Sequence, residues 1–281
     1  MKKTAALLLS LAFCLTLTAC GGQPAPAAAS ASPAASEPAS SAAPADSAPE
    51  EDAVPESSLR PDMPEEDRLV MVGAYADMLE TLLQTNTLPD GRELPGDMGD
   101  QCFALCDVDG DGAEELIFSN GNAPYMAAMA AYVYAYDADT EMLRTELECF
   151  PAMDFYDNGM VKVLWSHNQG LAGDSLWPYD LLQYDASTDS YRRIAMVDAW
   201  DRTIRDTNEQ GDPFPAEVDV SGTGVVYFIM TGEAYDTSHP VDVTDYESWE
   251  QEVLGGAQEL DVVYREMTED NISLLRTGEL N

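Results

Sequence analysis

The acidic run from Asp107 to Glu115 constrains the fold of this chain more than any other stretch. It reads Asp-Val-Asp-Gly-Asp-Gly-Ala-Glu-Glu, with carboxylates at the first, third and fifth positions and glycine at the sixth. Oxygen ligands at this spacing can converge on one hard cation, and Gly112 permits the sharp turn that brings them together. Short apolar runs at 102–106 and 116–118 flank the loop, so the pattern predicts strand, loop and strand.

The spacing of this loop predicts a calcium site. An EF-hand would need a glutamate at the twelfth position and a helix on each side, but Phe118 stands there. The alternative is a hairpin rich in Asp and Gly that holds no metal. Calcium is favoured because three carboxylates this close would otherwise repel one another. The expected ligands are the carboxylates of Asp107, Asp109, Asp111 and Glu115 and the carbonyl oxygen of Ala113.

The loop also resembles a known group of motifs. The pattern Asp-x-Asp-x-Asp-Gly-x-x-Glu followed directly by Leu-Ile is similar to the calcium loops of FG-GAP and VCBS-type repeats. Such repeats occur in β-propellers and in many extracellular bacterial proteins. The resemblance covers about a dozen residues, so it implies a calcium cofactor and says little about activity.

The N-terminus has the pattern of a secretory leader. Lys2 and Lys3 precede an apolar run over 5–17 that is too short to span a membrane, which predicts a signal peptide over 1–19. The run ends in Leu-Thr-Ala-Cys-Gly, which resembles a bacterial lipobox with Cys20 as the lipidated thiol. Ordinary secretion with an incidental cysteine is the alternative. Two acyl chains would hold the protein on the extracytoplasmic face of the cell membrane.

Composition divides the remainder of the chain in two. Residues 20–59 are mostly Ala, Pro and Ser and, beyond Cys20, contain no aromatic residue, Lys or Arg, which predicts a disordered tether. Residues 60–281 are expected to form one β-rich domain. The full chain has a formal net charge of −39 at pH 7. Removal of the leader takes away Lys2 and Lys3 and makes the net charge more negative. This charge excludes nucleic acid as a partner and makes the domain depend on its lipid for membrane attachment.

The pattern of the folded part predicts an α+β protein. A helix should begin after Pro64, with a buried stripe of apolar residues at helical spacing. Near the C-terminus, a capping-box pattern from Thr244 to Glu247 and the cap Thr268 predict two short helices, the first ended by Gly255. Strands are expected over 132–136, 160–165, 181–184, 191–197 and 225–230. The apolar stripe is Leu69, Val72, Ala76, Leu79 and Leu83.

Two turns in the β-rich region repeat each other. The segments 136–144 and 184–192 lie 48 residues apart and share the pattern Tyr-Asp-Ala-x-Thr-x-x-x-Arg. This offset is near the length of a propeller blade, so the expected sheet is mostly antiparallel and partly propeller-like. The segment 219–227 echoes the acidic loop, but Ser221 and Thr223 replace carboxylates, which argues against a metal there.

Three cysteines remain after Cys20. Cys102 and Cys106 lie on one face of an expected strand, too far apart to pair without a bend. Cys149 could pair with either of them, because an extracytoplasmic protein can form disulfides. The odd number favours free thiols.

One pattern suggests an enzyme. Gly-Asp-Ser-Leu around Ser175 and Asp-x-x-His ending at His239 resemble the nucleophile and base blocks of GDSL hydrolases. The late position of Ser175, in a β-rich region without a Gly-Asn-Asp block, argues against this hydrolase. We therefore expect a non-enzymatic binding or structural module, with an envelope hydrolase as the alternative. An envelope protein or a glycan could be the ligand, and its binding platform could be Trp165, Trp177, Tyr179 and Trp200, although aromatic residues in strands are more often core.

Overall fold

The structure, a computed structural model, describes residues 63–168 and 171–280. The expected signal peptide, the lipidated Cys20 and the tether over 20–59 lie outside these residues. Within the described part of the chain, no helix combines the length and the apolar character that crossing a membrane requires.

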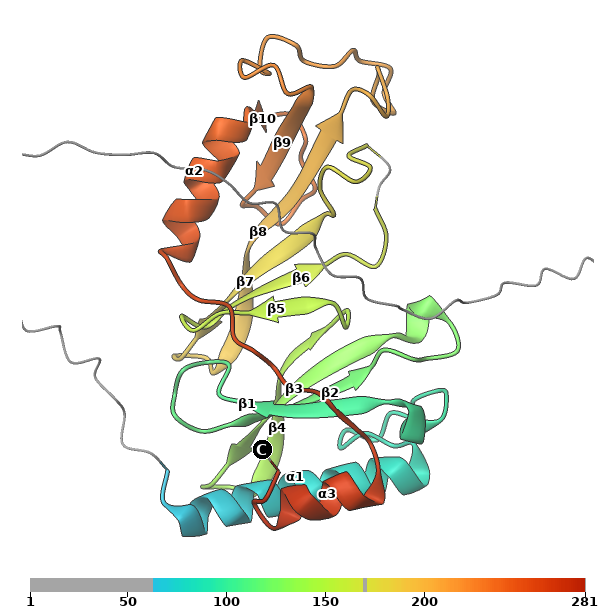
Figure 1. The fold of residues 1–281 in the computed structure, drawn as a ribbon, viewed down its shortest axis with the longest axis vertical. Coiled ribbons are helices and arrows are strands. Elements are labelled where there is room, and N and C mark those ends of the chain that lie inside the picture. The colour runs from blue at the N-terminus through green and yellow to red at the C-terminus, as the bar shows by residue number, and fades with distance from the viewer. Residues whose placement is uncertain (1–62, 169–170, 281) are drawn as a thin grey trace, which may run out of the picture. The chain divides into compact units, whose positions relative to one another are not determined.

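Two antiparallel sheets and three α-helices make up the described chain (Figure 1). This architecture confirms the expected α+β class with mostly antiparallel pairing; the propeller-like part stays a prediction. The first sheet has the order β11 (Arg265–Glu266), β1 (Cys102–Cys106), β2 (Glu115–Asn120), β3 (Ala130–Asp137) and β4 (Met142–Cys149). The second has the order β10 (Pro240–Val241), β9 (Val225–Met230), β8 (Ser190–Asp201), β7 (Tyr179–Asp185), β6 (Met160–Leu164) and β5 (Met153–Phe155).

Helix α1 (Glu65–Thr85) begins where the sequence predicts it, directly after Pro64. Acidic residues fill its first turn, where they stabilise the positive end of the helix. Val72, Ala76 and Leu79 of the expected stripe are fully buried, but Leu69 is 40% exposed. The buried part of the apolar face therefore starts one turn later than predicted.

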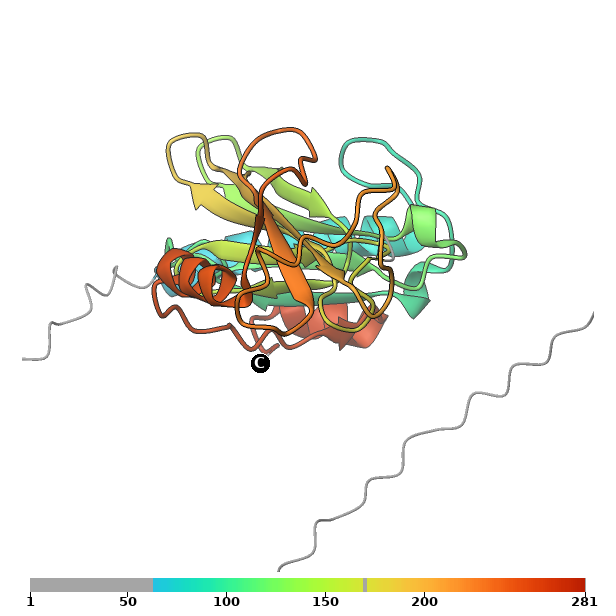
Figure 2. The same cartoon turned by 90° about the horizontal axis from the view of Figure 1, so that it is seen from above.

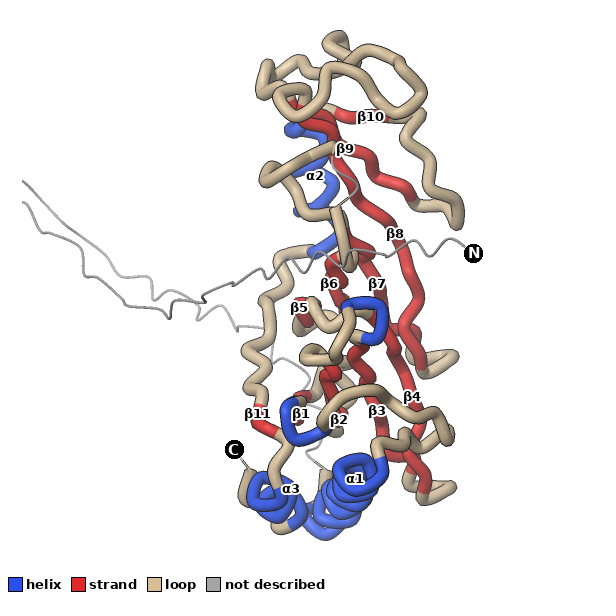
Figure 3. Tube along the Cα trace, turned by 90° about the vertical axis from the view of Figure 1, so that its right-hand side faces the viewer, coloured by secondary structure: helices blue, strands red, loops and turns tan. Residues whose placement is uncertain are grey.

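The C-terminal helix α3 (Glu269–Arg276) packs beside α1, as Figure 3 shows. Thr268 caps it as predicted, since its side chain accepts a hydrogen bond from the backbone N–H of Asn271. At its other end, the guanidinium of Arg276 lies 2.6 Å from Asp77 and 3.1 Å from Glu80 on α1. The two helices cover an apolar core that they share with the first sheet.

Helix α2 (Val243–Leu254) packs against the second sheet through stacked rings of Tyr227 and Tyr246, whose centroids are 4.3 Å apart. Its cap is Asp242, so the prediction of a capping box that starts at Thr244 is wrong. Asp242 accepts hydrogen bonds from the backbone and the hydroxyl of Thr244, which leaves Thr244 inside the first turn. Gly255 ends the helix as predicted, with φ 61°.

The two sheets share a further core. Apolar residues of β1 to β4 in the first sheet pack with residues of β5 and β6 in the second. Figure 2 views this arrangement from the end where the loops around β9 project. Two 3-10 turns, η1 (Met98–Asp100) and η2 (Met126–Ala128), lie in loops beside the first sheet. The central buried residues of the shared core are Ala104, Val108, Ile117, Val133, Leu147, Phe155, Val161 and Val163.

The two repeated turns are both hairpin turns, joining β3 to β4 and β7 to β8. Each hairpin also contains a β-bulge, which the sequence did not predict. In the first, Val133 pairs with Leu147 and Tyr134 with Thr145, which leaves Glu146 without a partner. In the second, the same shift leaves out Ile194, which lies 48 residues later. The hairpins thus repeat each other in their strands as well as in their turns.

Candidate metal centre

In the acidic loop between β1 and β2, backbone N–H groups donate hydrogen bonds to the carboxylates of the loop itself. Asp107 Oδ1 accepts a hydrogen bond from the backbone N–H of Gly110 at 2.8 Å, and its Oδ2 accepts one from Gly112 at 3.1 Å. Asp109 Oδ1 accepts one from the N–H of Asp111 at 2.9 Å. Gly110 and Gly112 have φ of 78° and 92°, conformations that favour glycine. The glycines therefore allow the turn that the sequence predicts.

Three carboxylates of the loop converge. One oxygen each from Asp107, Asp109 and Glu115 lies within 4.8 Å of the others. Glu115, at the start of β2, is only 2% exposed and accepts a hydrogen bond from the backbone N–H of Val108 at 2.9 Å. Burial, and then the negative charge of Asp109, raises the pKa of Glu115 to about 10. A divalent cation would supply the missing positive charge.

The other two expected ligands lie at the edge of this group. Asp111 is exposed and is not one of the three converging carboxylates. Its Oδ1 accepts a hydrogen bond from the backbone N–H of Ala113 at 2.7 Å. Asp111 thus orients the backbone at Ala113.

A second acidic group extends the centre, and the sequence analysis missed it. Asp109, Glu146 and Asp189 also place one carboxylate oxygen each within 4.8 Å of one another. Glu146 is the bulge residue of β4, and Asp189 is the left-handed residue of the β7–β8 turn, with φ 52°. The repeated hairpins were the available signal, but nothing in their sequence indicates that both reach the acidic loop.

Burial dominates the electrostatics of the second group. Glu146 has a pKa raised to about 8, first by burial and then by the negative charge of Asp109. The pKa of Asp109 is itself raised, again mainly by burial. Arg144 partly compensates the charge: its guanidinium lies 3.0 Å from Glu146 Oε1 and also contacts Asp189 Oδ2.

Several contacts join the acidic loop to the second sheet. Tyr191 donates its hydroxyl to the carbonyl of Val108 at 3.1 Å, and the Tyr184 hydroxyl forms a hydrogen bond with the carboxylate of Asp109. The turn between β5 and β6 also approaches closely, because a Cβ on Gly159 would lie 3.4 Å from the carbonyl oxygen of Asp109. The centre therefore lies where the two sheets meet.

Helix α1 fixes the other side of the loop. The guanidinium of Arg68 lies 2.8 Å from the carboxylate of Glu114, and the Tyr75 hydroxyl donates to the Glu114 carbonyl at 3.0 Å. Glu114 is thus held away from the converging carboxylates, and Glu115 is the acid that enters the group.

The segment 219–227, whose sequence resembles that of the acidic loop, has a different structure. Asp219 accepts hydrogen bonds from the Gly224 N–H at 3.0 Å and from the Thr223 hydroxyl at 3.3 Å. Ser221 donates its hydroxyl to Asp242 Oδ1 at 2.8 Å, which ties this loop to the start of α2. The carboxylates of Asp219 and Asp242 are therefore satisfied by the hydroxyl groups of Thr223 and Ser221, without a cation.

The proposed nucleophile and base of a hydrolase have different partners. The Ser175 hydroxyl donates to Asp201 Oδ2 at 2.6 Å. His239 is exposed, and its Nδ1 lies 2.8 Å from the Ser238 hydroxyl and 3.8 Å from Asp236. This arrangement does not favour a catalytic pair of Ser175 and His239, which would need a hydrogen bond between them.

The cysteines form no disulfide in the described chain, and two of the four aromatic residues of the expected platform are buried. Cys102, Cys106 and Cys149 are free thiols. Tyr179 is 1% exposed and Trp200 is 4% exposed, so neither belongs to an exposed platform. Trp177 is 47% exposed and donates its indole N–H to the carbonyl of Trp165 at 2.7 Å.

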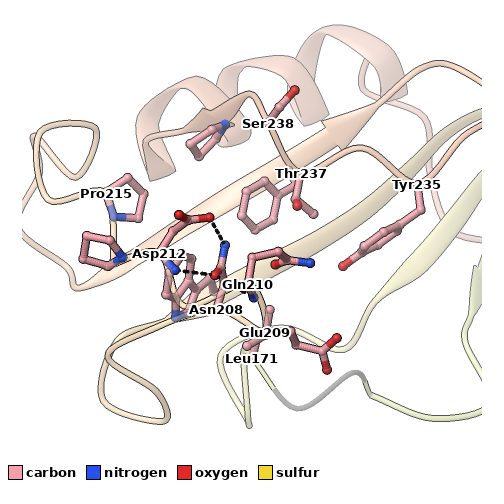
Figure 4. Close-up of a pocket in the computed structure, with 13 residues that line it drawn as sticks. Leu171, Asn208, Glu209, Gln210, Asp212, Pro215, Tyr235, Thr237 and Ser238 are labelled. Atoms are coloured by element: carbon pink, nitrogen blue, oxygen red, sulfur yellow. Dashed lines mark hydrogen bonds between the residues drawn. The ribbon is translucent and has the colours of Figure 1, made fainter.

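A separate pocket of about 300 Å3 lies under the loops next to β9 (Figure 4). Aromatic rings and side-chain amides line it together. Asn208 and Asp212 hold one wall, since Asn208 Oδ1 accepts from the N–H of Asp212 at 2.8 Å and Asn208 Nδ2 donates to its carboxylate at 3.1 Å. The main lining residues are Leu171, Trp200, Asn208, Gln210, Phe228, Tyr235 and Thr237.

Comparison of the chain with protein-family models, with curated proteins and with solved structures finds no match.

Proposed function

We propose that this protein is an extracytoplasmic lipoprotein, anchored to the cell membrane through Cys20, whose β-rich domain is a calcium-stabilised binding or structural module. The convergence of Asp107, Asp109 and Glu115 carries the calcium part of the proposal. The leader pattern before Cys20 supports the anchor.

The chemistry of the donors supports calcium over other metals. Both acidic groups consist of carboxylates alone, and calcium is a hard cation that takes six to eight oxygen ligands. Magnesium requires a compact octahedral shell and keeps its waters.

The role of the cation would be structural. The loop lies between β1 and β2, contacts α1 through Glu114, and contacts the second sheet through Tyr191. A calcium ion on this loop would therefore stabilise three parts of the domain at once. Binding to the folded state alone adds about 2.7 kcal/mol at a hundredfold excess over the Kd.

The test is thermal unfolding of the metal-stripped full chain with calcium or with EDTA. Calcium at millimolar concentration should raise the Tm, and magnesium should raise it less. Asp109→Ala should abolish the calcium shift, because Asp109 belongs to both acidic groups, and Asp111→Ala should reduce it. Asp219→Ala is the matched control in the echo loop and should leave the shift intact, although its own stability changes. Equal melting temperatures in calcium and in EDTA would contradict the proposal.

The anchor is tested separately with Cys20→Ser. We expect the variant to lose incorporation of a palmitate analogue and to leave the lipid fraction of the cells. Unchanged labelling would contradict lipidation at Cys20 and leave ordinary secretion.

The unidentified ligand of such a module would fit the pocket beside β9. Its rings from Trp200, Phe228 and Tyr235 and its amides from Asn208 and Gln210 suit a glycan, which stacks on aromatic faces and exchanges hydrogen bonds. Saturation-transfer NMR with cell-wall saccharides tests this. Signals that persist in Tyr235→Ala would place the glycan elsewhere.

A further inference from the structure

The carboxyl of Glu146 is in an unusual position for an acidic side chain. The side chain is only 1% exposed, and its Oε2 has no hydrogen-bond partner among residues 63–168 and 171–280. A buried carboxylate oxygen without a donor carries a large desolvation cost. Bulges often re-aim a side chain at a site, and Glu146 is the bulge residue of β4.

The groups that face this oxygen are also acidic. Asp109 and Asp189 each place a carboxylate oxygen within 4.8 Å of one from Glu146. Arg144 binds the outer oxygens, Glu146 Oε1 and Asp189 Oδ2. Glu146 Oε2 has no donor in the described chain, and Asp189 Oδ1 accepts the Tyr184 hydroxyl. The carboxyl groups of Glu146 and Asp189 also interact directly with each other.

A positive species is needed between carboxyl groups that lie this close together. It can be a proton shared between Glu146 and Asp189, or a cation bound by both of them and by Asp109. Two features favour the cation: three carboxylates converge rather than two, and Asp109 already belongs to the calcium loop. Arg144 then acts as an outer partner that orients two ligands, as such partners do at metal sites.

We propose that Asp109, Glu146 and Asp189 form a second calcium site, adjacent to the loop site and sharing Asp109 with it. This inference rests on the proposed function, since the loop ion supplies the first of the two positions. The second ion would join the loop, β4 of the first sheet and the β7–β8 hairpin of the second. It would therefore stabilise the packing of the two sheets against each other.

The test is calorimetric titration of the metal-stripped full chain, in detergent, with calcium chloride alone. The wild-type chain should bind two calcium ions. Glu146→Gln and Asp189→Asn should each bind one, because an amide keeps the size of the side chain but loses the charge. Glu141→Gln is the matched control: Glu141 occupies the equivalent turn position in the first hairpin, is exposed, and should leave two ions bound.

The outcomes separate this inference from the proposed function. One ion in the wild type, unchanged by Glu146→Gln or Asp189→Asn, would overturn the second site, would leave the calcium loop standing and would indicate the shared proton. No ion in the wild type would overturn both. Circular dichroism of each variant shows whether it is folded. Loss of one ion in both variants, which lie in different segments, would show that the loss is not caused by unfolding of one of them.

Discussion

The β3–β4 and β7–β8 hairpins have the same design but contribute different residues to the acidic centre. Both have an aspartate that accepts hydrogen bonds from its own turn, a left-handed residue at the end of the turn, and a bulge five residues later. The left-handed residue is exposed Glu141 in the first hairpin and Asp189 in the second. The bulge residue is Glu146 in the first and Ile194 in the second.

The acidic centre uses one position from each hairpin. It takes the bulge residue of the first, Glu146, and the left-handed residue of the second, Asp189. The equivalent residues differ in role: Ile194 packs against the core of the second sheet, and Glu141 lies in solvent. The same backbone design therefore brings an acidic residue to the centre in one place and packs an apolar residue in another, depending on where the assembled sheets place it.

Metal removal should produce the largest effect, and it should affect the two turns differently. With both sites filled at a hundredfold excess over the Kd, calcium adds about 5 kcal/mol to the free energy of unfolding. EDTA should therefore lower the Tm strongly and speed amide exchange in the turn at 186–189. The turn at 138–141 should keep its exchange rates, because the N–H groups of Asp139 and Thr140 bond to Asp137 within the turn. Equal changes at both turns, measured by hydrogen exchange and mass spectrometry, would contradict the asymmetry.

Exchanging the bulge residues is the next test. Ile194→Glu should destabilise the fold by about 2 kcal/mol, because it places a charge against an apolar core without a partner. Ile194→Val is its control and should cost about 1 kcal/mol.

The reciprocal change, Glu146→Ile, should leave the metal-free stability nearly unchanged, because it removes a buried oxygen without a donor while Arg144 keeps its ion pair with Asp189. It should remove one of the two calcium ions. Urea unfolding in EDTA and in calcium measures both effects. A Glu146→Ile variant that loses several kcal/mol in EDTA would show that the carboxyl stabilises the metal-free protein.

Glycine at the two left-handed positions should give effects of opposite sign. Glu141→Gly relieves the strain of a positive φ and should stabilise the fold by about 0.5 kcal/mol, after the larger entropy of glycine in the unfolded chain is subtracted. Asp189→Gly gains the same relief but loses the contacts with Tyr184 and Arg144, so it should destabilise by about 1 kcal/mol. Thermal unfolding of both variants in EDTA, where no bound calcium adds to the difference, checks the signs. Stabilisation by both would mean that Asp189 serves only the turn.

Acid should affect the two turns alike, with the smallest expected effect. The turn N–H and hydroxyl groups lower the pKa of Asp137 and of Asp185 below the usual value. A carboxyl whose pKa is lower in the folded state stabilises the fold above its unfolded pKa of about 3.9. This contribution is lost as the pH falls through the lowered folded value. NMR titration of the two carboxyls should give similar midpoints, and one ordinary midpoint would show that the turns differ.

The sequence by itself determined the local features of this protein. The turn of the acidic loop, the caps at Thr268 and Gly255 and the repeated turns all depend on contacts between residues only a few positions apart. Most of the α1 stripe was also predictable, because helical spacing decides which residues share a face. Strand β4 was missed because its charged residues hide the pattern of its buried positions.

Only the tertiary structure decided the second half of the acidic centre. Glu146 and Asp189 are 43 positions apart in the sequence, and each looks like an ordinary charged residue near a turn. Glu146 is buried because a bulge, set by the pairing of β3 with β4, turns it inward. Asp189 reaches it because the two sheets pack against a shared core. The pairing register and the sheet packing depend on the whole domain, so no short stretch of sequence contains them.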